Sequence, residues 1–133
     1  MLAQHADLTS KIIGCAYKVY NTLGFGFLES VYEKCMLIEL ARIGVQAQQQ
    51  YPITVLYEGH VVGEFVADLW VEDAVIVELK SVRAIAQAHE VHLVNYLKAT
   101  GKDVGLVVNF GESKVEVKRK VRELPPRPVD DEI

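Results

Sequence analysis

The residues best suited to chemistry are two acids and a lysine near the middle of the chain, Asp68, Glu78 and Lys80. Carboxylate oxygens are hard ligands for Mg²⁺ or Mn²⁺, and an ammonium group stabilises negative charge that develops on a phosphodiester. These residue types therefore indicate metal-dependent phosphodiester hydrolysis. Spacing alone leaves an alternative open, in which Glu78 and Lys80 end a strand as a solvent-exposed pair of little energetic value.

The segment 74–80 predicts a strand, because apolar residues occupy every odd position from Val75 to Leu79. Alternation of side chains along a strand then places Glu78 and Lys80 on the same face. The backbone carbonyl of Leu79 becomes a further candidate ligand, since a hard cation accepts backbone oxygen.

Asp68 joins this face only in one strand register. Residue 68 must stand opposite Glu78, which requires a loop of odd length or a bulge between the two strands. A strict turn of two residues at 72–73 would pair Asp68 with Val77 and send its carboxylate to the opposite face. The register is therefore a geometric test of the predicted site.

Hydrophobic periodicity and turn residues predict the elements that must position this site. Helices are expected at 8–23, with Thr9 or Ser10 as the cap, from Val31 towards Gly44, and at 85–100. Strands are expected at 47–57, 61–71, 74–80, 104–110 and 115–121, with a hairpin turn at 58–60.

The element order α-α-β-β-β-α-β-β predicts an α/β fold with a mixed sheet. A helix between the third and fourth strands makes this pair parallel, because parallel neighbours need a long crossover. We expect a single domain over 1–124, followed by a flexible Pro-rich acidic tail at 125–133.

The composition places the chain among globular proteins, with half of its residues apolar. No apolar run approaches the roughly 18 residues that span a membrane, and the start lacks the pattern of a signal peptide, so a cytoplasmic location is expected. Cys15 and Cys35 lack the paired spacing of a zinc site, which favours buried reduced thiols.

The formal net charge of −4 argues against a protein that coats nucleic acid by bulk electrostatics. Any nucleic-acid binding should be weak and salt-sensitive, unless a homodimer joins two faces. A local basic stretch between Lys114 and Arg122 either contacts phosphate or forms a solvated strand face.

The segment Gly26-Phe27-Leu28-Glu29-Ser30-Val31-Tyr32 resembles the GxxExxY family. The resemblance continues in order through Asp68-Leu69-Trp70-Val71, Val77-Glu78-Leu79-Lys80-Ser81, the segments 95–101 and 105–111, and Lys118-Arg119. That family is similar to the PD-(D/E)xK nucleases, which implies a restriction-endonuclease-like core. It also implies that Asp68 and Glu78 are metal ligands, that Lys80 is the catalytic lysine, and that Glu29 is an added acid.

Helical spacing bears on the remaining candidates. Glu29 and Tyr32 are three residues apart and share a face, although Glu29 is also explained as a first-turn acid favoured by the helix dipole. Related nucleases have a glutamine four residues before a tyrosine where this chain has His92 and Tyr96. His92 could bind phosphate, donate a hydrogen bond to Glu78, or mark a drifted site, and His89 is expected to be an exposed helix residue.

The leading hypothesis is a nuclease that uses Mg²⁺ or Mn²⁺ to cleave DNA or RNA. The alternative is a catalytically inactive module of nuclease fold that binds or assembles with partners. The intact set of Asp68, Glu78 and Lys80 favours the nuclease. A phosphate cradle at Gly24-Phe25-Gly26 is disfavoured, because no Walker lysine follows it.

Overall fold

The computed structural model describes residues 5–122, so the predicted tail at 125–133 lies outside the described residues. Three helices and five strands follow one another in the predicted order. They are α1 (Ala6–Leu23), α2 (Glu29–Arg42), β1 (Ala47–Tyr57), β2 (His60–Val71), β3 (Val75–Lys80), α3 (Gln87–Thr100), β4 (Val104–Phe110) and β5 (Val115–Val121).

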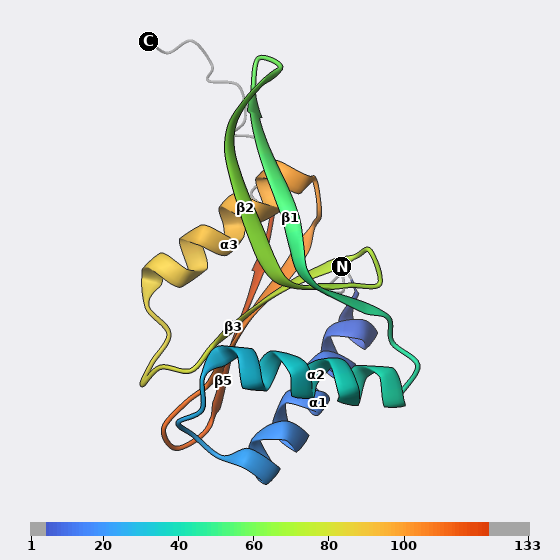
Figure 1. Cartoon of the computed structure of the whole chain (residues 1–133), viewed down its shortest axis with the longest axis vertical. Helices are drawn as coiled ribbons and strands as arrows, with labels where there is room; N and C mark the ends of the chain where they lie inside the picture. Colours follow the sequence, from blue (N-terminus) through green and yellow to red (C-terminus); the bar gives the residue numbers. More distant parts are fainter. Residues whose placement is uncertain (1–4, 123–133) are drawn as a thin grey trace, which may run out of the picture.

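The strands form one mixed sheet in the order β1-β2-β3-β4-β5 (Figure 1). Three neighbouring pairs are antiparallel, and β3 and β4 are parallel. Helix α3 lies between β3 and β4 in the sequence and provides the crossover that this parallel pair requires. The predicted mixed sheet with one parallel pair is therefore confirmed.

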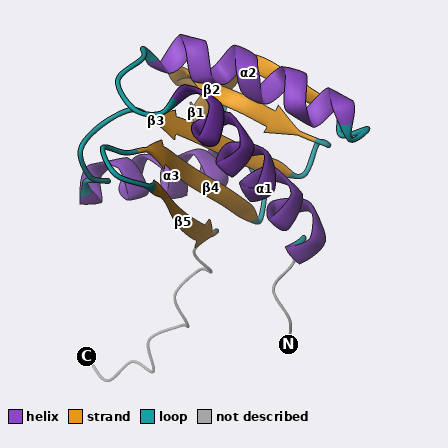
Figure 2. Cartoon of the chain, turned by 90° about the horizontal axis from the view of Figure 1, so that it is seen from below, coloured by secondary structure: helices purple, strands orange, loops and turns teal. Residues whose placement is uncertain are grey.

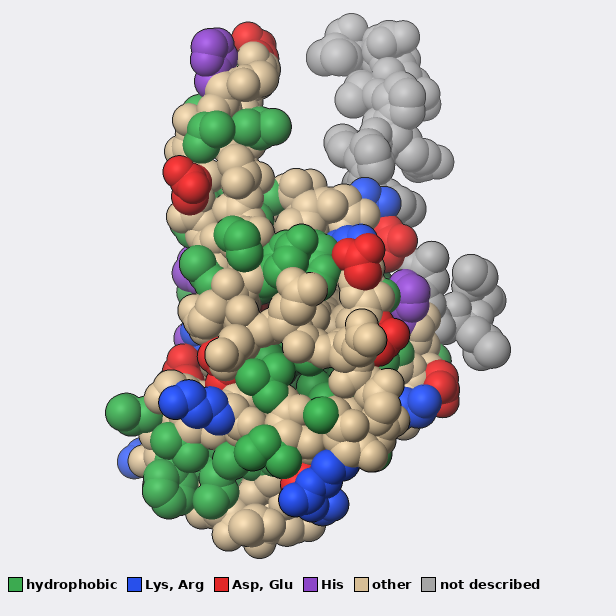
Figure 3. Space-filling model, turned by 45° about the vertical axis from the view of Figure 1, so that its right-hand side comes forward, with side chains coloured by type: hydrophobic (Ala, Val, Ile, Leu, Met, Phe, Trp, Pro, Cys, Tyr) green, Lys and Arg blue, Asp and Glu red, His purple; other side chains and the backbone are tan. Residues whose placement is uncertain are grey.

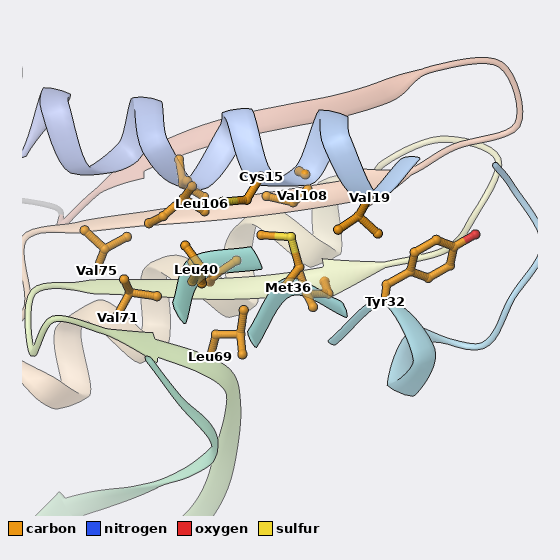
Figure 4. Packing of buried hydrophobic residues seen from close by; sticks show 14 of the residues in the cluster. Cys15, Val19, Tyr32, Met36, Leu40, Leu69, Val71, Val75, Leu106 and Val108 are labelled. Atoms are coloured by element: carbon orange, nitrogen blue, oxygen red, sulfur yellow. The ribbon is translucent and has the colours of Figure 1, made fainter. Parts of the chain in front are cut away.

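Helices cover both faces of the sheet. Helices α1 and α2 lie on one face and α3 lies on the other (Figure 2). The larger core forms under α1 and α2, where Met36 and Leu40 pack against strand residues such as Leu69 and Leu106 (Figure 4). Alternation along β3 sends its odd-numbered residues into this core and Ile76 into the smaller core beneath α3.

Two local predictions need correction. The β1–β2 turn consists of Glu58 and Gly59 alone, with φ angles of 49° and 84°, because two left-handed residues match the twist of a hairpin. Helix α1 begins earlier than its expected cap. His5 precedes its first residue, and the hydroxyl of Thr9 donates to the carbonyl of Ala6 at 3.1 Å instead of capping the helix.

The outer part of the β1–β2 hairpin stands clear of the body as an arm (Figure 3). Its exposed large apolar side chains are Leu56, Tyr57, Val61, Val62, Phe65 and Val66. The sequence has no Lys or Arg between Arg42 and Lys80, so the arm carries no positive charge from these residues with which to bind phosphate.

Among the described residues, no helix is long and apolar enough to cross a membrane. Both cysteines are free. Cys15 is buried, and burial is the largest cause of the raised pKa of its thiol. Cys35 is only partly buried, so the prediction of buried reduced thiols holds fully for Cys15 alone.

Candidate active site

The register between β2 and β3 decides whether the predicted site can form. Leu69 pairs with Val77, and Val71 pairs with Val75, so three residues, 72–74, connect the strands. The same register sets Asp68 opposite Glu78. The connection therefore has the odd length that the predicted site requires, and the two-residue turn does not occur.

The side chains of this connection hold it in place. Glu72 and Asp73 have φ angles of 53° and 52°. The indole N–H of Trp70 donates to Asp73 Oδ1 at 3.0 Å, and the amide of Gln46 donates to Glu72 Oε2 at 2.6 Å. The hydrogen bond from Trp70 is the largest cause of the lowered pKa of Asp73.

Beyond Leu69 and Val77 the regular pairing ends, and the strands form a fork, as Figure 1 shows where β2 and β3 diverge. At this point carboxylate side chains, in place of backbone carbonyls of the neighbouring strand, accept the backbone N–H hydrogen bonds. The amide of Asp68 donates to Glu78 Oε2 at 3.0 Å, and the amide of Leu79 donates to Asp68 Oδ2 at 2.7 Å. Within the described residues, the second oxygen of each carboxylate accepts no hydrogen bond.

The orientation of Leu79 supports its predicted role. Its N–H faces β2, because it reaches the Asp68 carboxylate. The N–H and C=O of one strand residue point to the same neighbouring strand. The Leu79 carbonyl is therefore directed to the side on which Asp68 lies.

Burial disfavours the charged form of both carboxylates at the fork. Burial raises the pKa of Glu78 to about 8, and the nearby Asp68 carboxylate adds to this increase. Burial also raises the pKa of Asp68, against the opposing effect of the hydrogen bond from Leu79. Lys80 lowers both pKa values, yet within residues 5–122 it forms no ion pair. The fork is thus deficient in positive charge.

Helices α2 and α3 bring further predicted residues to the fork. Glu29 begins α2, and its charge raises the pKa of both Asp68 and Glu78. On α3, burial and then the charges of Glu78 and Asp68 raise the pKa of Tyr96. Figure 1 shows that the first turns of both helices lie towards the open end of the fork.

The histidines of α3 extend the same cluster. Burial lowers the pKa of His89, and the charges of Lys80 and His92 lower it further. His92 is exposed, whereas His89 is partly buried and accepts a hydrogen bond from the Ala86 amide through Nδ1 at 3.1 Å. The expectation that His89 is simply exposed is therefore wrong, because its ring supports the start of α3.

Tyr32 occupies the core beneath α2 and has no solvent exposure. Its ring stacks on Phe110 with the centroids 4.2 Å apart. Its hydroxyl donates to the Gly24 carbonyl at 2.5 Å and accepts from the Phe27 amide at 3.3 Å. These contacts fix the glycine-containing loop before α2, which gives Tyr32 a structural part in placing Glu29.

Sequence reasoning missed three polar residues around the fork. Glu33 is only 8% exposed, and its spacing of four residues from Glu29 was the signal that could have revealed it. Its amide partner Gln50 gave no signal. Asn109 is fully buried in the otherwise apolar β4, where it accepts from the Val82 amide at 2.9 Å and donates to the Val82 carbonyl at 2.8 Å. Asn109 thereby anchors the chain just after Lys80.

The donor atoms at the fork suit a partly hydrated ion. Within residues 5–122, no three His, Cys, Asp or Glu side chains are grouped closely enough to hold a metal ion. The fork instead offers one unbonded oxygen each from Asp68 and Glu78, together with the Leu79 carbonyl. Mg²⁺ keeps several waters and needs only one or two carboxylates, so these hard donors fit Mg²⁺ or Mn²⁺.

A sequence model of the PD-(D/E)XK nuclease superfamily matches residues 6–120. The chain belongs to this superfamily. The match runs from the start of α1 into β5 and includes every residue at the fork. The five-stranded mixed sheet and the element order agree with a PD-(D/E)XK core.

A solved structure shares the overall fold of this PD-(D/E)XK chain. The crystal structure of SSO0001 matches with a TM-score of 0.58 and 13% sequence identity. The alignment covers 92% of this chain and 61% of SSO0001, so the chain spans less than two thirds of that protein. A comparison with curated proteins finds no match.

Proposed function

We propose that this PD-(D/E)XK protein is a Mg²⁺- or Mn²⁺-dependent nuclease of the GxxExxY type that hydrolyses phosphodiester bonds in DNA or RNA. The observation that carries the proposal is the fork itself. There, Asp68 and Glu78 meet at the end of a strand ladder with Lys80 beside them and with little positive charge to balance them. An arrangement that costs stability in this way is typical of a functional site.

In this proposal Asp68, Glu78 and the Leu79 carbonyl hold the ion. The bound ion would polarise the phosphoryl group and lower the pKa of a bound water. Lys80 stabilises the charge that develops on the phosphate, which its lack of an ion pair permits.

The helices complete the proposed site. Glu29 acts as an auxiliary acid at the open end of the fork, where its side chain is exposed to solvent. On α3, the charges of Glu78 and Asp68 act on Tyr96, and His92 lies one turn earlier with its side chain exposed, so both are available to substrate.

A groove beside the site supports a nucleic-acid substrate. It has a volume of about 780 Å³, lies between the arm and α3, and is lined in part by Phe65, His92 and Tyr96. The rings of Phe65 and Tyr96 are 5.8 Å apart, and aromatic surfaces of this kind stack on nucleic-acid bases. Because the arm provides no Lys or Arg, we expect weak binding that decreases as the salt concentration rises.

The test is a calorimetric titration with Mg²⁺ and Mn²⁺, combined with cleavage assays on plasmid DNA, single-stranded DNA and RNA. Asp68→Asn preserves the shape of the side chain and removes its charge, and Asp7→Asn is the control because Asp7 is an exposed acid of α1. We expect ion binding and cleavage in the wild type and in Asp7→Asn, and loss of both in Asp68→Asn. Cleavage that persists in Asp68→Asn, or in the presence of EDTA, would refute the proposal.

The second candidate is a catalytically inactive binding or assembly module of the same fold. The lack of a closed group of three ligands within residues 5–122 favours it. It predicts that the wild type neither binds Mn²⁺ nor cleaves any of the three substrates.

A further inference from the structure

Gln50 has an unfavourable backbone conformation inside a strand. Its φ angle is 51°, in the left-handed region that side chains other than glycine, asparagine and aspartate rarely adopt. The other described residues of this kind, apart from glycine, lie in the turns between strands or before α1. In the β1–β2 register, Gln49 pairs with Leu69 and Tyr51 pairs with Ala67, but the intervening pair of Gln50 and Asp68 is missing. The β1–β2 ladder is thus interrupted beside the fork.

The side chain of Gln50 has a specific partner on α2. Its Nε2 donates to both carboxylate oxygens of Glu33, at 2.8 and 2.9 Å. Glu33 is 8% exposed and, within residues 5–122, forms no ion pair. A buried carboxylate without a cation is costly, and an apolar residue would serve the core better. The strained backbone of Gln50 and the buried charge of Glu33, each unfavourable by itself, are therefore joined by one contact.

The contact lies next to the proposed metal ligands. Gln50 lies between the β1 residues that pair with Leu69 and Ala67, so it stands beside Asp68, and its amide holds the Glu33 carboxylate at this point. The charge of Glu33 also raises the pKa of Asp68. Glu33 follows Glu29 by one helical turn and shares its face of α2. The side chains of the two acids differ. That of Glu29 is exposed and makes no hydrogen bond among the described residues, whereas the side-chain amide of Gln50 holds the Glu33 carboxylate.

We propose that Gln50 is a positioning residue, which holds the Glu33 carboxylate towards Asp68 so that Glu33 binds a water ligand of the ion. This inference rests on the proposed nuclease function. Mg²⁺ and Mn²⁺ keep part of their hydration shell, so an acid beyond direct contact still contributes to affinity. A carboxylate that is held by a hydrogen-bonding neighbour loses less freedom when the ion binds. The left-handed backbone of Gln50 is what directs its amide to α2.

The variants separate positioning from folding. Gln50→Gly removes the amide but accepts the φ angle of 51° without strain. Glu33→Gln keeps the shape and removes the charge. Gln49→Gly is the matched control, because it makes the same change one position earlier in β1.

The measurement is Mn²⁺ affinity by calorimetry on the metal-free full chain, with urea unfolding to compare stability. Gln50→Gly and Glu33→Gln are each expected to weaken Mn²⁺ binding about 10- to 100-fold, the usual effect of losing a residue that orients a ligand. The double variant is expected to bind no more weakly than Glu33→Gln, because Gln50 acts through Glu33. Gln49→Gly is expected to retain the wild-type affinity.

Two results would overturn the inference in distinguishable ways. If Gln50→Gly and Glu33→Gln bind Mn²⁺ as tightly as the wild type while Asp68→Asn does not bind it, the Gln50–Glu33 contact serves only to connect α2 to β1, and the positioning role is refuted. If the wild type binds no Mn²⁺, or if Asp68→Asn binds it unchanged, the proposed nuclease site fails and the inference fails with it.

Discussion

The protonation of Glu78 should make the metal-free protein less stable as the pH rises. In the folded protein, burial and the neighbouring Asp68 raise the pKa of Glu78 to about 8, from an ordinary value of 4.5 that the unfolded chain retains. Between these two values unfolding releases a proton, so the free energy of unfolding falls with rising pH. The stability contributed by the neutral carboxyl is complete below pH 4.5 and is lost as the pH passes through about 8.

The two pKa values set the size of this effect. A tenfold change in proton affinity corresponds to about 1.4 kcal/mol, so the full difference is on the order of 5 kcal/mol. From about pH 6 to about pH 8 the expected loss is about 2 kcal/mol. Asp68 adds a loss of the same sign, because its pKa is also raised.

Urea unfolding in EDTA across this pH range measures the effect. Glu78→Gln retains an acceptor for the Asp68 amide and cannot ionise, so its free energy of unfolding should fall less steeply with pH and exceed that of the wild type in alkali. Glu112→Gln is the control, because Glu112 is an exposed carboxylate in the β4–β5 connection. Identical pH profiles for Glu78→Gln and the wild type would refute the reasoning.

Three further predictions concern individual side chains. Lys80→Met should lower cleavage by about 10²- to 10³-fold without weakening Mn²⁺ binding, and a loss of Mn²⁺ binding in calorimetry would contradict an electrostatic role. Asn109→Ala should lower the free energy of unfolding by about 2–3 kcal/mol, because two buried hydrogen bonds to the chain after β3 are lost; an unchanged urea midpoint would count against this anchor. Gly105→Ala should lower the free energy of unfolding by about 1–3 kcal/mol, since the added Cβ would lie 2.7 Å from Leu93 Cδ1. Gly14→Ala has open space in α1 and should raise the free energy of unfolding by about 0.5–1 kcal/mol. Similar effects of both variants in thermal unfolding would disprove the packing argument.

Local sequence patterns predicted the elements and part of the site. Alternation along 74–80 correctly separated Val75, Val77 and Leu79 from Glu78 and Lys80, because side-chain direction in a strand follows from sequence position alone. The crossover helix likewise required the parallel pairing of β3 and β4. The resemblance of the motifs to known nucleases named the acids of the proposed site.

Only the tertiary structure decided which residues meet. The position of Asp68 depended on whether the β2–β3 connection has two residues or three, and both lengths fit the same strand patterns. The left-handed backbone of Gln50 left no local signal, and the spacing of Glu33 from Glu29 did not reveal their contact, because each residue is unfavourable by itself and is explained by the other across two elements. Sequence by itself thus determined the strands, their faces and the candidate acids, whereas register and long-range contacts, which depend on loop geometry and packing, assembled them at the fork.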